Sequence, residues 1–252
     1  MRLRALGTGT IALTGARVRA GYLVDVGPVR LLMDCGSGVT HRLAELGEDW
    51  MGITHVAISH FHADHIADLP TLIFAWKYGA LPARAAPVEI LGPSGILRVL
   101  RGMAQGFGDW VTEPGFPLSI REVAPDVRLE LAPGVTLASR KTPHTEESLA
   151  WSVEHEGRRI VYTGDTGYDE SLAEWARGAD VFLMECSLPA EMAIKEHLTP
   201  EQCGALAAVA RPRRLVLTHL YPPVERVDIR AAVASHFAGE VIIASDGMLI
   251  EV

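Results

Sequence analysis

The sequence predicts an α/β fold in which two β-sheets pack face to face and helices cover their outer surfaces. Both halves of the chain carry several short apolar segments typical of strands, with helical segments after them. The 252 residues are 48% hydrophobic, enough to bury a sizeable core and to exclude a disordered chain. No strand is followed by a GxGxxG dinucleotide-binding turn. We therefore expect one domain that spans residues 1–252.

The first half of the chain begins with strands. Two apolar segments, residues 21–26 and 29–33, are joined by the turn dipeptide Gly27-Pro28, which predicts a hairpin. The glycine- and proline-containing stretch 107–117 is predicted as a loop. For the remainder we expect strands at residues 3–6 and 56–59, and helices at about 66–78 and 96–105.

The second half repeats this pattern. Thr199 followed by Pro200 and Glu201 has the features of a helix start, namely an N-cap, a proline in the first turn and an acidic first turn. That helix is predicted to run to about Ala210, and another covers about 168–177. Strands are predicted at residues 127–131, 135–142, 149–155, 158–163, 181–184, 215–218 and 241–244.

Composition excludes several classes of protein. With 23 basic and 31 acidic residues, the net charge of −8 disfavours a sequence-independent grip on nucleic acid. No stretch approaches the roughly 18 to 20 apolar residues of a membrane span, so we expect no membrane partner. The three cysteines, Cys35, Cys186 and Cys203, lie far apart and cannot all pair, which predicts free thiols and a cytoplasmic location.

The segment SHFHADHIADL, residues 59–69, carries candidate chemistry. Alternate residues of an extended strand point the same way, so His60 and His62 face one point at the strand end. If the chain then turns into a helix, Asp64 and His65 come from its first turn. Imidazoles and a carboxylate are suitable ligands for zinc or a similar divalent ion. Four donors so close together rarely serve one tetrahedral ion, which predicts two ions and further ligands elsewhere.

Further candidate ligands follow other predicted strands: they are His144, Asp165 and His219. Each alone is more simply a turn or core residue, but together with residues 60–65 they form the pattern of active-site groups on a scaffold. The remaining histidines except His197 are interpreted as structural: His41, His55, His155 and His236.

With these residues the chain resembles the metallo-β-lactamase superfamily, whose HxHxDH signature is matched by His60, His62, Asp64 and His65. The match continues in order through His144, Asp165 and His219. The resemblance implies a four-layer αββα sandwich with two divalent metal ions, zinc first and manganese or iron as alternatives. It implies that one ion is held by His60, His62 and His144, the other by Asp64, His65 and His219, and that Asp165 bridges them.

Within the superfamily the chain is most similar to the ribonuclease Z-like phosphodiesterases. The turn Asp34-Cys35-Gly36-Ser37-Gly38, the TGDT sequence around Asp165, Glu185 after an apolar strand, and His197 carry this similarity. It implies that Glu185 and His197 form a relay whose histidine faces the scissile phosphate. Only 165 − 144 = 21 positions separate His144 from Asp165, too few for the long arm with which ribonuclease Z grips tRNA.

These features predict a metal-dependent hydrolase, a dinuclear phosphodiesterase acting on RNA 3′ ends or on small or cyclic phosphodiesters. We expect a metal-activated hydroxide, oriented by Asp64, to attack phosphorus while His197, oriented by Glu185, protonates the leaving oxygen. Two alternatives stay open. One is a lactonase or other ester or phosphotriester hydrolase, which would not need the relay, and the other is a non-catalytic binding protein. The aromatic residues between 74 and 116 fit either a lid or the surface of a homodimer.

Overall fold

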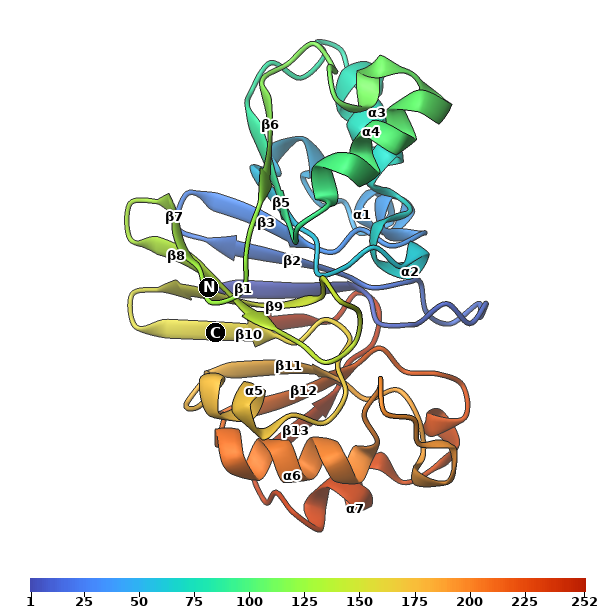
Figure 1. The fold of residues 1–252 in the computed structure, drawn as a ribbon, viewed down its shortest axis with the longest axis vertical. Helices are drawn as coiled ribbons and strands as arrows, with labels where there is room; N and C mark the ends of the chain where they lie inside the picture. Colours follow the sequence, from blue (N-terminus) through green and yellow to red (C-terminus); the bar gives the residue numbers. More distant parts are fainter.

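The computed structural model describes residues 1–252, which form two seven-stranded sheets stacked face to face between two layers of helices (Figure 1). The predicted fold class is confirmed. The first sheet has the order β14-β1-β2-β3-β4-β5-β6, and the second has the order β13-β12-β11-β10-β9-β8-β7. The strands are β1 (Arg2–Gly7), β2 (Gly21–Val26), β3 (Val29–Met33), β4 (His55–Ala57), β5 (Val88–Gly92), β6 (Leu118–Glu122), β7 (Arg128–Ala132), β8 (Val135–Lys141), β9 (Leu149–His155), β10 (Arg158–Tyr162), β11 (Val181–Glu185), β12 (Arg214–Thr218), β13 (Glu240–Ile243) and β14 (Leu249–Glu251).

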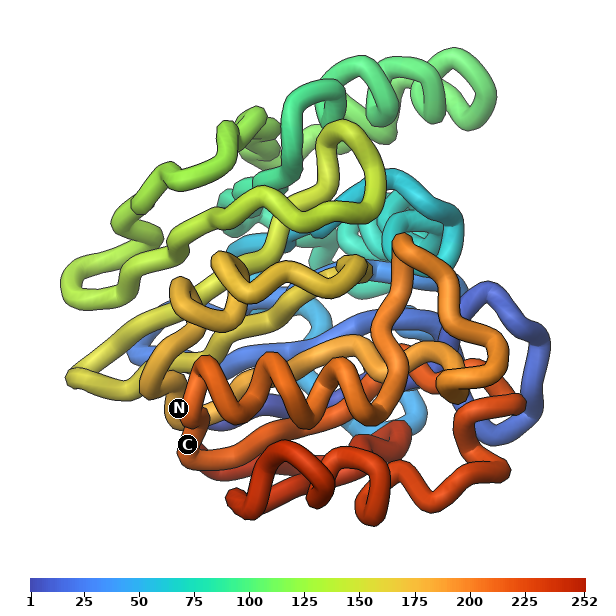
Figure 2. Tube along the Cα trace, turned by 60° about the horizontal axis from the view of Figure 1, so that its bottom comes forward, coloured from blue at the N-terminus to red at the C-terminus, as the bar shows by residue number.

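Helices cover the outer face of each sheet. The first sheet packs against α1 (Val39–Glu45), α3 (Leu69–Tyr78) and α4 (Ile96–Phe107), with the single turn α2 (Ala63–Ile66) at its edge. The second packs against α5 (Glu170–Trp175), α6 (Pro200–Ala210) and α7 (Ile229–Ala234). In Figure 2, α6 and α7 lie side by side on this surface. Short 3₁₀ turns occupy Trp50–Gly52, Asp109–Val111, Ala190–Met192 and Val224–Arg226.

The main core lies between the sheets. Its largest members, Tyr22, Trp151 and Tyr162, are almost fully buried, and the rings of Tyr22 and Tyr162 lie 4.8 Å apart. Burial of each such side chain contributes about 1.5 to 3 kcal/mol, so this layer holds the sheets in a fixed relation. No helix combines the length and the apolar character that crossing a membrane requires.

The helix predicted at about 66–78 is confirmed as α3, but it begins three residues later than expected, because the chain breaks at Ala67 and Asp68 after the separate turn α2. Pro70, in the first turn of α3, has no N–H to continue a helix from α2. The Asp68 carboxylate instead accepts hydrogen bonds from the Gly38 and Thr40 amides, both at 3.0 Å, and so caps the start of α1.

Residues 107–117, the stretch predicted as a loop, lie on the outer helix layer. The Trp110 ring is 4.7 Å from that of Phe74, and Lys77 Nζ donates to the Pro114 carbonyl at 2.6 Å. Trp76 is fully buried, whereas Phe74, Tyr78 and Phe107 remain exposed. The segment after α4, with its 3₁₀ turn at Asp109–Val111, therefore packs against both α3 and α4.

Candidate metal centre

Parallel strands bring the candidate residues to one edge of the sandwich. In the first sheet β3 and β4 are parallel, and in the second β10, β11 and β12 are parallel, so their carboxyl ends meet at common edges. The residues that leave these ends are Asp34 after β3, His60 after β4, Asp165 after β10, Glu185 at the end of β11 and His219 after β12. Two of them, Asp34 and His219, adopt left-handed backbone conformations with φ of 58° and 56°. Such conformations cost about 1 to 3 kcal/mol each and are typical of functional sites.

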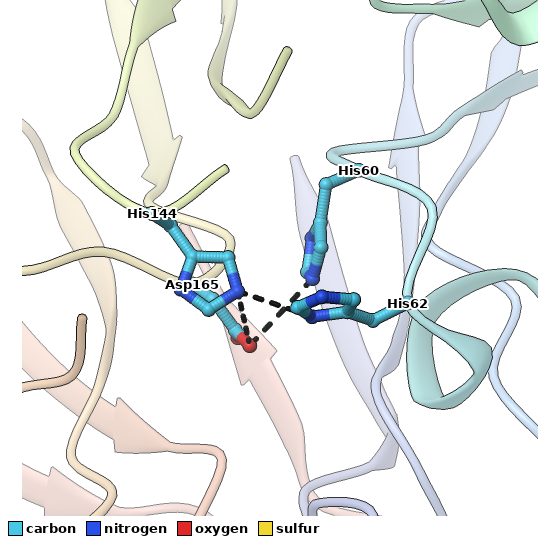
Figure 3. Close-up of side chains that lie close together, drawn as sticks. All are labelled: His60, His62, His144 and Asp165. Atoms are coloured by element: carbon cyan, nitrogen blue, oxygen red, sulfur yellow. Dashed lines mark hydrogen bonds and ion pairs between the residues drawn. The ribbon is translucent and has the colours of Figure 1, made fainter. Parts of the chain in front are cut away.

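The first group of donors contains His60, His62, His144 and Asp165 (Figure 3). His144 Nε2 lies 3.1 Å from His62 Nδ1. The Asp165 Oδ2 atom lies 3.7 Å from both His60 Nε2 and His144 Nε2. Figure 3 shows the three rings and the carboxylate turned toward a common point.

The second group contains Asp64, His65 and His219. Its two imidazole Nε2 atoms are 3.3 Å apart, and Asp64 Oδ2 lies 3.4 Å from His219 Nε2. Asp165 stands between the groups, because its other oxygen, Oδ1, lies 3.2 Å from His65 Nε2 and 3.3 Å from His219 Nε2. The seven residues predicted as ligands are therefore all brought together, with Asp165 at the centre.

The donor set fits divalent cations. Donors about 2.0 to 2.2 Å from a tetrahedral ion lie roughly 3.3 to 3.6 Å from one another. The separations are close to this spacing, 3.1 to 3.7 Å in the first group and 3.3 to 4.0 Å in the second. Two buried atoms at the centre, His60 Nε2 and Asp165 Oδ1, have no hydrogen-bond partner. Because unpaired buried polar atoms are costly, their position between the two groups is explained if they bind cations.

The electrostatics of the site agree with this interpretation. Burial lowers the pKa of His60 well below its ordinary value, which leaves a neutral ring with a free lone pair. Burial also disfavours charge on His65, but Asp165 and Asp34 outweigh it and raise the pKa of that ring well above its ordinary value. Although burial opposes ionisation of Asp165, the neighbouring His219 and His65 hold the pKa of this carboxyl well below its ordinary value. The cluster thus offers a neutral ring at His60 and a charged carboxylate at Asp165, whereas the carboxylates around His65 favour a proton on that ring in the absence of a cation.

A second layer of side chains orients the rings. Asp34 Oδ2 accepts from His65 Nδ1 at 2.7 Å and from the hydroxyls of Tyr162 and Ser59 at 2.7 and 2.8 Å. His144 Nδ1 donates to the Glu196 carbonyl at 3.0 Å. With Nδ1 engaged, His65 and His144 both turn Nε2 toward the centre of the cluster.

Beside the cluster, Glu185 and His197 form a hydrogen-bonded pair. Glu185 Oε1 lies 2.9 Å from His197 Nδ1 and also accepts from the Thr166 amide at 2.7 Å. The carboxylate is fully buried, whereas the imidazole is partly exposed. Burial alone lowers the pKa of His197, but Glu185 raises it to about 9, so the ring carries a proton at neutral pH. His197 also lies within ligand distance of Asp165 and His219.

Two serines of this layer were not predicted. Ser59 and Ser187 are fully buried and contact both a carboxylate and a histidine of the site. Ser59 directly precedes His60, and Ser187 follows Glu185 by two positions, but single serines occur throughout the chain and carry no distinctive pattern. The four histidines interpreted as structural, His41, His55, His155 and His236, belong to none of the donor groups.

Comparisons with known proteins agree on the family. The model of the β-lactamase superfamily domain matches residues 29–220. The chain is 29% identical to ribonuclease Z of Mycobacterium bovis over 280 aligned residues, which cover 100% of this chain and 98% of that protein. It is similar to the metallo-β-lactamase fold protein YhfI of Bacillus subtilis, with a TM-score of 0.86, 27% identity and coverage of 99% and 98%. The short form of human tRNase Z shares the fold, with a TM-score of 0.80, 24% identity and coverage of 100% and 99%.

Proposed function

The chain belongs to the metallo-β-lactamase superfamily, and from this membership we propose that it is a dinuclear metal-dependent phosphodiesterase acting on small or cyclic phosphodiesters. The observation that carries the proposal is the position of the Glu185 and His197 pair beside two donor groups that share Asp165. An ester or lactone hydrolase would need the donor groups but not the pair. The similarity to ribonuclease Z supports phosphodiester chemistry.

The residues divide into ligands and proton-handling groups. One ion would be held by His60, His62 and His144, the other by Asp64, His65 and His219, and Asp165 would contact both. The donor set favours zinc, with manganese or iron as alternatives. When bound, two such ions stabilise charge on phosphoryl oxygens and lower the pKa of water toward about 7.

The proton required by the leaving oxygen is assigned to His197. Glu185 holds Nδ1 of this ring, which leaves Nε2 free to donate toward a substrate. Asp64 belongs to the second donor group, and it would also orient the attacking water. The sequence prediction of Asp64, Glu185 and His197 as the residues that carry the reaction is retained here as part of the proposal.

Surface charge favours a small substrate over an RNA end. The loops that carry His144, Asp165 and His197 cover residues 142–148, 163–169 and 186–199. These loops contain one lysine, Lys195, and no arginine. Besides Asp165, they contain five acidic residues, Glu146, Glu147, Asp169, Glu191 and Glu196. An RNA backbone would meet repulsion here, since RNA binding draws its affinity from basic contacts to phosphates.

The same loops expose apolar side chains. Tyr168, Met192 and Ile194 are each more than two-fifths exposed. The Lys195 carbonyl packs against Gly167, so these apolar residues line adjoining loops. Contact with them suits the organic groups of a small phosphodiester.

A substrate panel tests the proposal. Metal-replete protein is assayed on bis(p-nitrophenyl) phosphate, 2′,3′-cyclic nucleotides, a precursor tRNA with a 3′ extension, and aliphatic lactones, each with and without chelator. We expect chelator-sensitive turnover of the small phosphodiesters and at least tenfold lower kcat/KM on the RNA. Absence of phosphodiester turnover contradicts the proposal, and turnover of lactones alone would favour the ester hydrolase. Efficient RNA cleavage would contradict the assignment of substrate size.

A further inference from the structure

Two buried serines connect the carboxylates Asp34 and Glu185 to histidines of the candidate metal centre. Each carboxylate contacts one histidine directly, Asp34 with His65 and Glu185 with His197. Each also reaches a second histidine through a serine hydroxyl. The same arrangement occurs at the end of a strand in each sheet.

Ser187 stands between Glu185 and His219. Its Oγ lies 2.5 Å from Glu185 Oε2 and 3.0 Å from His219 Nδ1. An ionised carboxylate can only accept, so the serine proton points to Glu185 and a serine lone pair accepts the Nδ1 proton of His219. The Nε2 atom of His219 is then unprotonated, and it faces Asp64 and Asp165.

Ser59 stands in the same way between Asp34 and His60. Its Oγ donates to Asp34 Oδ2 at 2.8 Å and accepts from His60 Nδ1 at 3.0 Å. The His60 Nε2 atom is left without a hydrogen-bond partner and faces Asp165 Oδ2 at 3.7 Å. Ser59 is thus the counterpart of Ser187 for the other donor group.

We propose that Ser59 and Ser187 are positioning residues, each of which fixes one histidine ligand in the tautomer that turns an unprotonated Nε2 toward the metal. Ser187 additionally ties the His219 ring to the Glu185 and His197 pair. The inference rests on the proposed function, since it takes His60 and His219 as ligands. It concerns these two histidines alone, because His65 and His144 have other Nδ1 acceptors, Asp34 and the Glu196 carbonyl.

The test is a zinc titration of four serine variants, read with a competing chromophoric chelator. Loss of a partner in the second layer typically weakens metal binding by about 10- to 100-fold. Ser187→Ala is therefore expected to weaken the binding of one of the two zinc ions by that factor and to leave the affinity for the other unchanged. Ser59→Ala is expected to weaken the binding of the other ion by the same factor. The double variant should therefore bind both zinc ions more weakly. Ser187→Thr, which keeps the hydroxyl, should stay within about threefold of wild type.

Ser152→Ala is the matched control. Ser152 is a buried serine in β9 whose hydroxyl contacts Arg159 at 2.8 Å, away from the donor groups. Its replacement should leave both zinc affinities unchanged. Should Ser187→Ala fail to fold, Ser187→Gly, which also lacks the hydroxyl, gives the same comparison without adding a zinc ligand.

The outcomes separate this inference from the proposed function. Wild-type zinc affinities in Ser59→Ala and Ser187→Ala, or equal weakening by Ser187→Thr and Ser187→Ala, would overturn the role of the hydroxyls. At saturating zinc, Ser187→Ala should also lower kcat on bis(p-nitrophenyl) phosphate with little change in KM. The titration needs no substrate, so a protein that turns over no phosphodiester but shows the serine effects refutes the proposed function alone.

Discussion

At the scale of single residues, the role of His197 is the first to test, because this histidine is either a proton donor or a metal ligand. It lies 2.9 Å from Glu185 and also within ligand distance of Asp165 and His219, so geometry alone permits both roles. If it donates a proton, His197→Ala should lower kcat by about 10²- to 10⁴-fold and leave the metal content at two ions per chain. Metal analysis beside steady-state kinetics checks this. A variant that loses an ion together with its activity would make His197 a ligand.

The pH dependence follows from the same pair. Glu185 raises the pKa of His197 to about 9 against the opposing effect of burial. A general acid must carry its proton, so activity should persist below pH 9 and fall as the pH rises through that value. Glu185→Gln removes the charge that holds the proton, and the fall should then occur at lower pH. The dependence of kcat/KM on pH, measured for wild type and for Glu185→Gln, gives the pH at which the activity of each falls. The same alkaline fall in both proteins would count against the role of the pair.

Sequence alone could predict the candidate donors and the Glu185 and His197 pair, but not the serines and the tyrosine that support them. The HxHxDH segment, His144, Asp165 and His219 stand out because donor residue types follow strand ends. The supporting residues Ser59, Ser187 and Tyr162 give no such signal, since their roles come from distances between segments up to 128 positions apart in the chain.

At the scale of elements, close backbone packing positions the loop that carries His197. A side chain at Gly167 would place its Cβ 2.0 Å from the Lys195 carbonyl oxygen, a backbone atom that cannot move alone. Gly167→Ala should therefore displace residues 189–197 and reduce kcat/KM at least tenfold. In the helical control Gly102→Ala, a Cβ meets nothing within 4 Å, and activity should be unchanged. Equal activities of the two variants would show that this loop tolerates displacement.

The start of α6 offers a test of stability. Thr199, which the sequence predicted as the N-cap, forms a capping box with Gln202. Thr199 Oγ1 accepts a hydrogen bond from the Gln202 amide, and the Gln202 side chain accepts one from the Thr199 amide. Thr199→Ala should lower the free energy of unfolding by about 1 kcal/mol in urea titrations. Thr71→Ala, at an exposed position of α3, should change it by less than about 0.5 kcal/mol. A Thr199→Ala variant as stable as wild type would contradict a stabilising cap.

Elements with a strong local pattern were predictable, and those defined by tertiary packing were not. The hairpin β2 to β3 was predicted to the residue because Gly27-Pro28 separates two apolar runs. The helix α1, which is only seven residues long and directly follows a glycine, was not predicted. Neither were β5 and β6. The capping of α1 by Asp68, thirty positions later, lies beyond any local pattern.

At the scale of the whole molecule, two sheets, each built mainly from one half of the chain, meet to form one cluster. His60, His62 and His65 come from the first half, and His144, Asp165 and His219 from the second. Sequence pattern predicted the layers because strands precede helices in each half. The order of the fourteen strands depends on pairings between distant segments, such as β1 with β14, which no local pattern contains.

Because ligands from both halves would share the ions, metal binding should stabilise the whole fold. Free zinc at 100 times its dissociation constant is expected to raise the free energy of unfolding by about 2.7 kcal/mol for each site. Urea unfolding with and without zinc, compared between wild type and Asp165→Asn, measures this. An identical zinc effect in both proteins would place the bound zinc outside the cluster.

The cluster at the sheet edge is proposed to hold two metal ions and to use them for phosphodiester hydrolysis. The most direct measurement is a titration of metal-free protein with zinc that follows bound metal and hydrolysis of bis(p-nitrophenyl) phosphate in the same sample. We expect two ions per chain, with activity that appears as the sites fill and disappears with chelator. A protein that binds two ions at this cluster and hydrolyses no phosphodiester would contradict it.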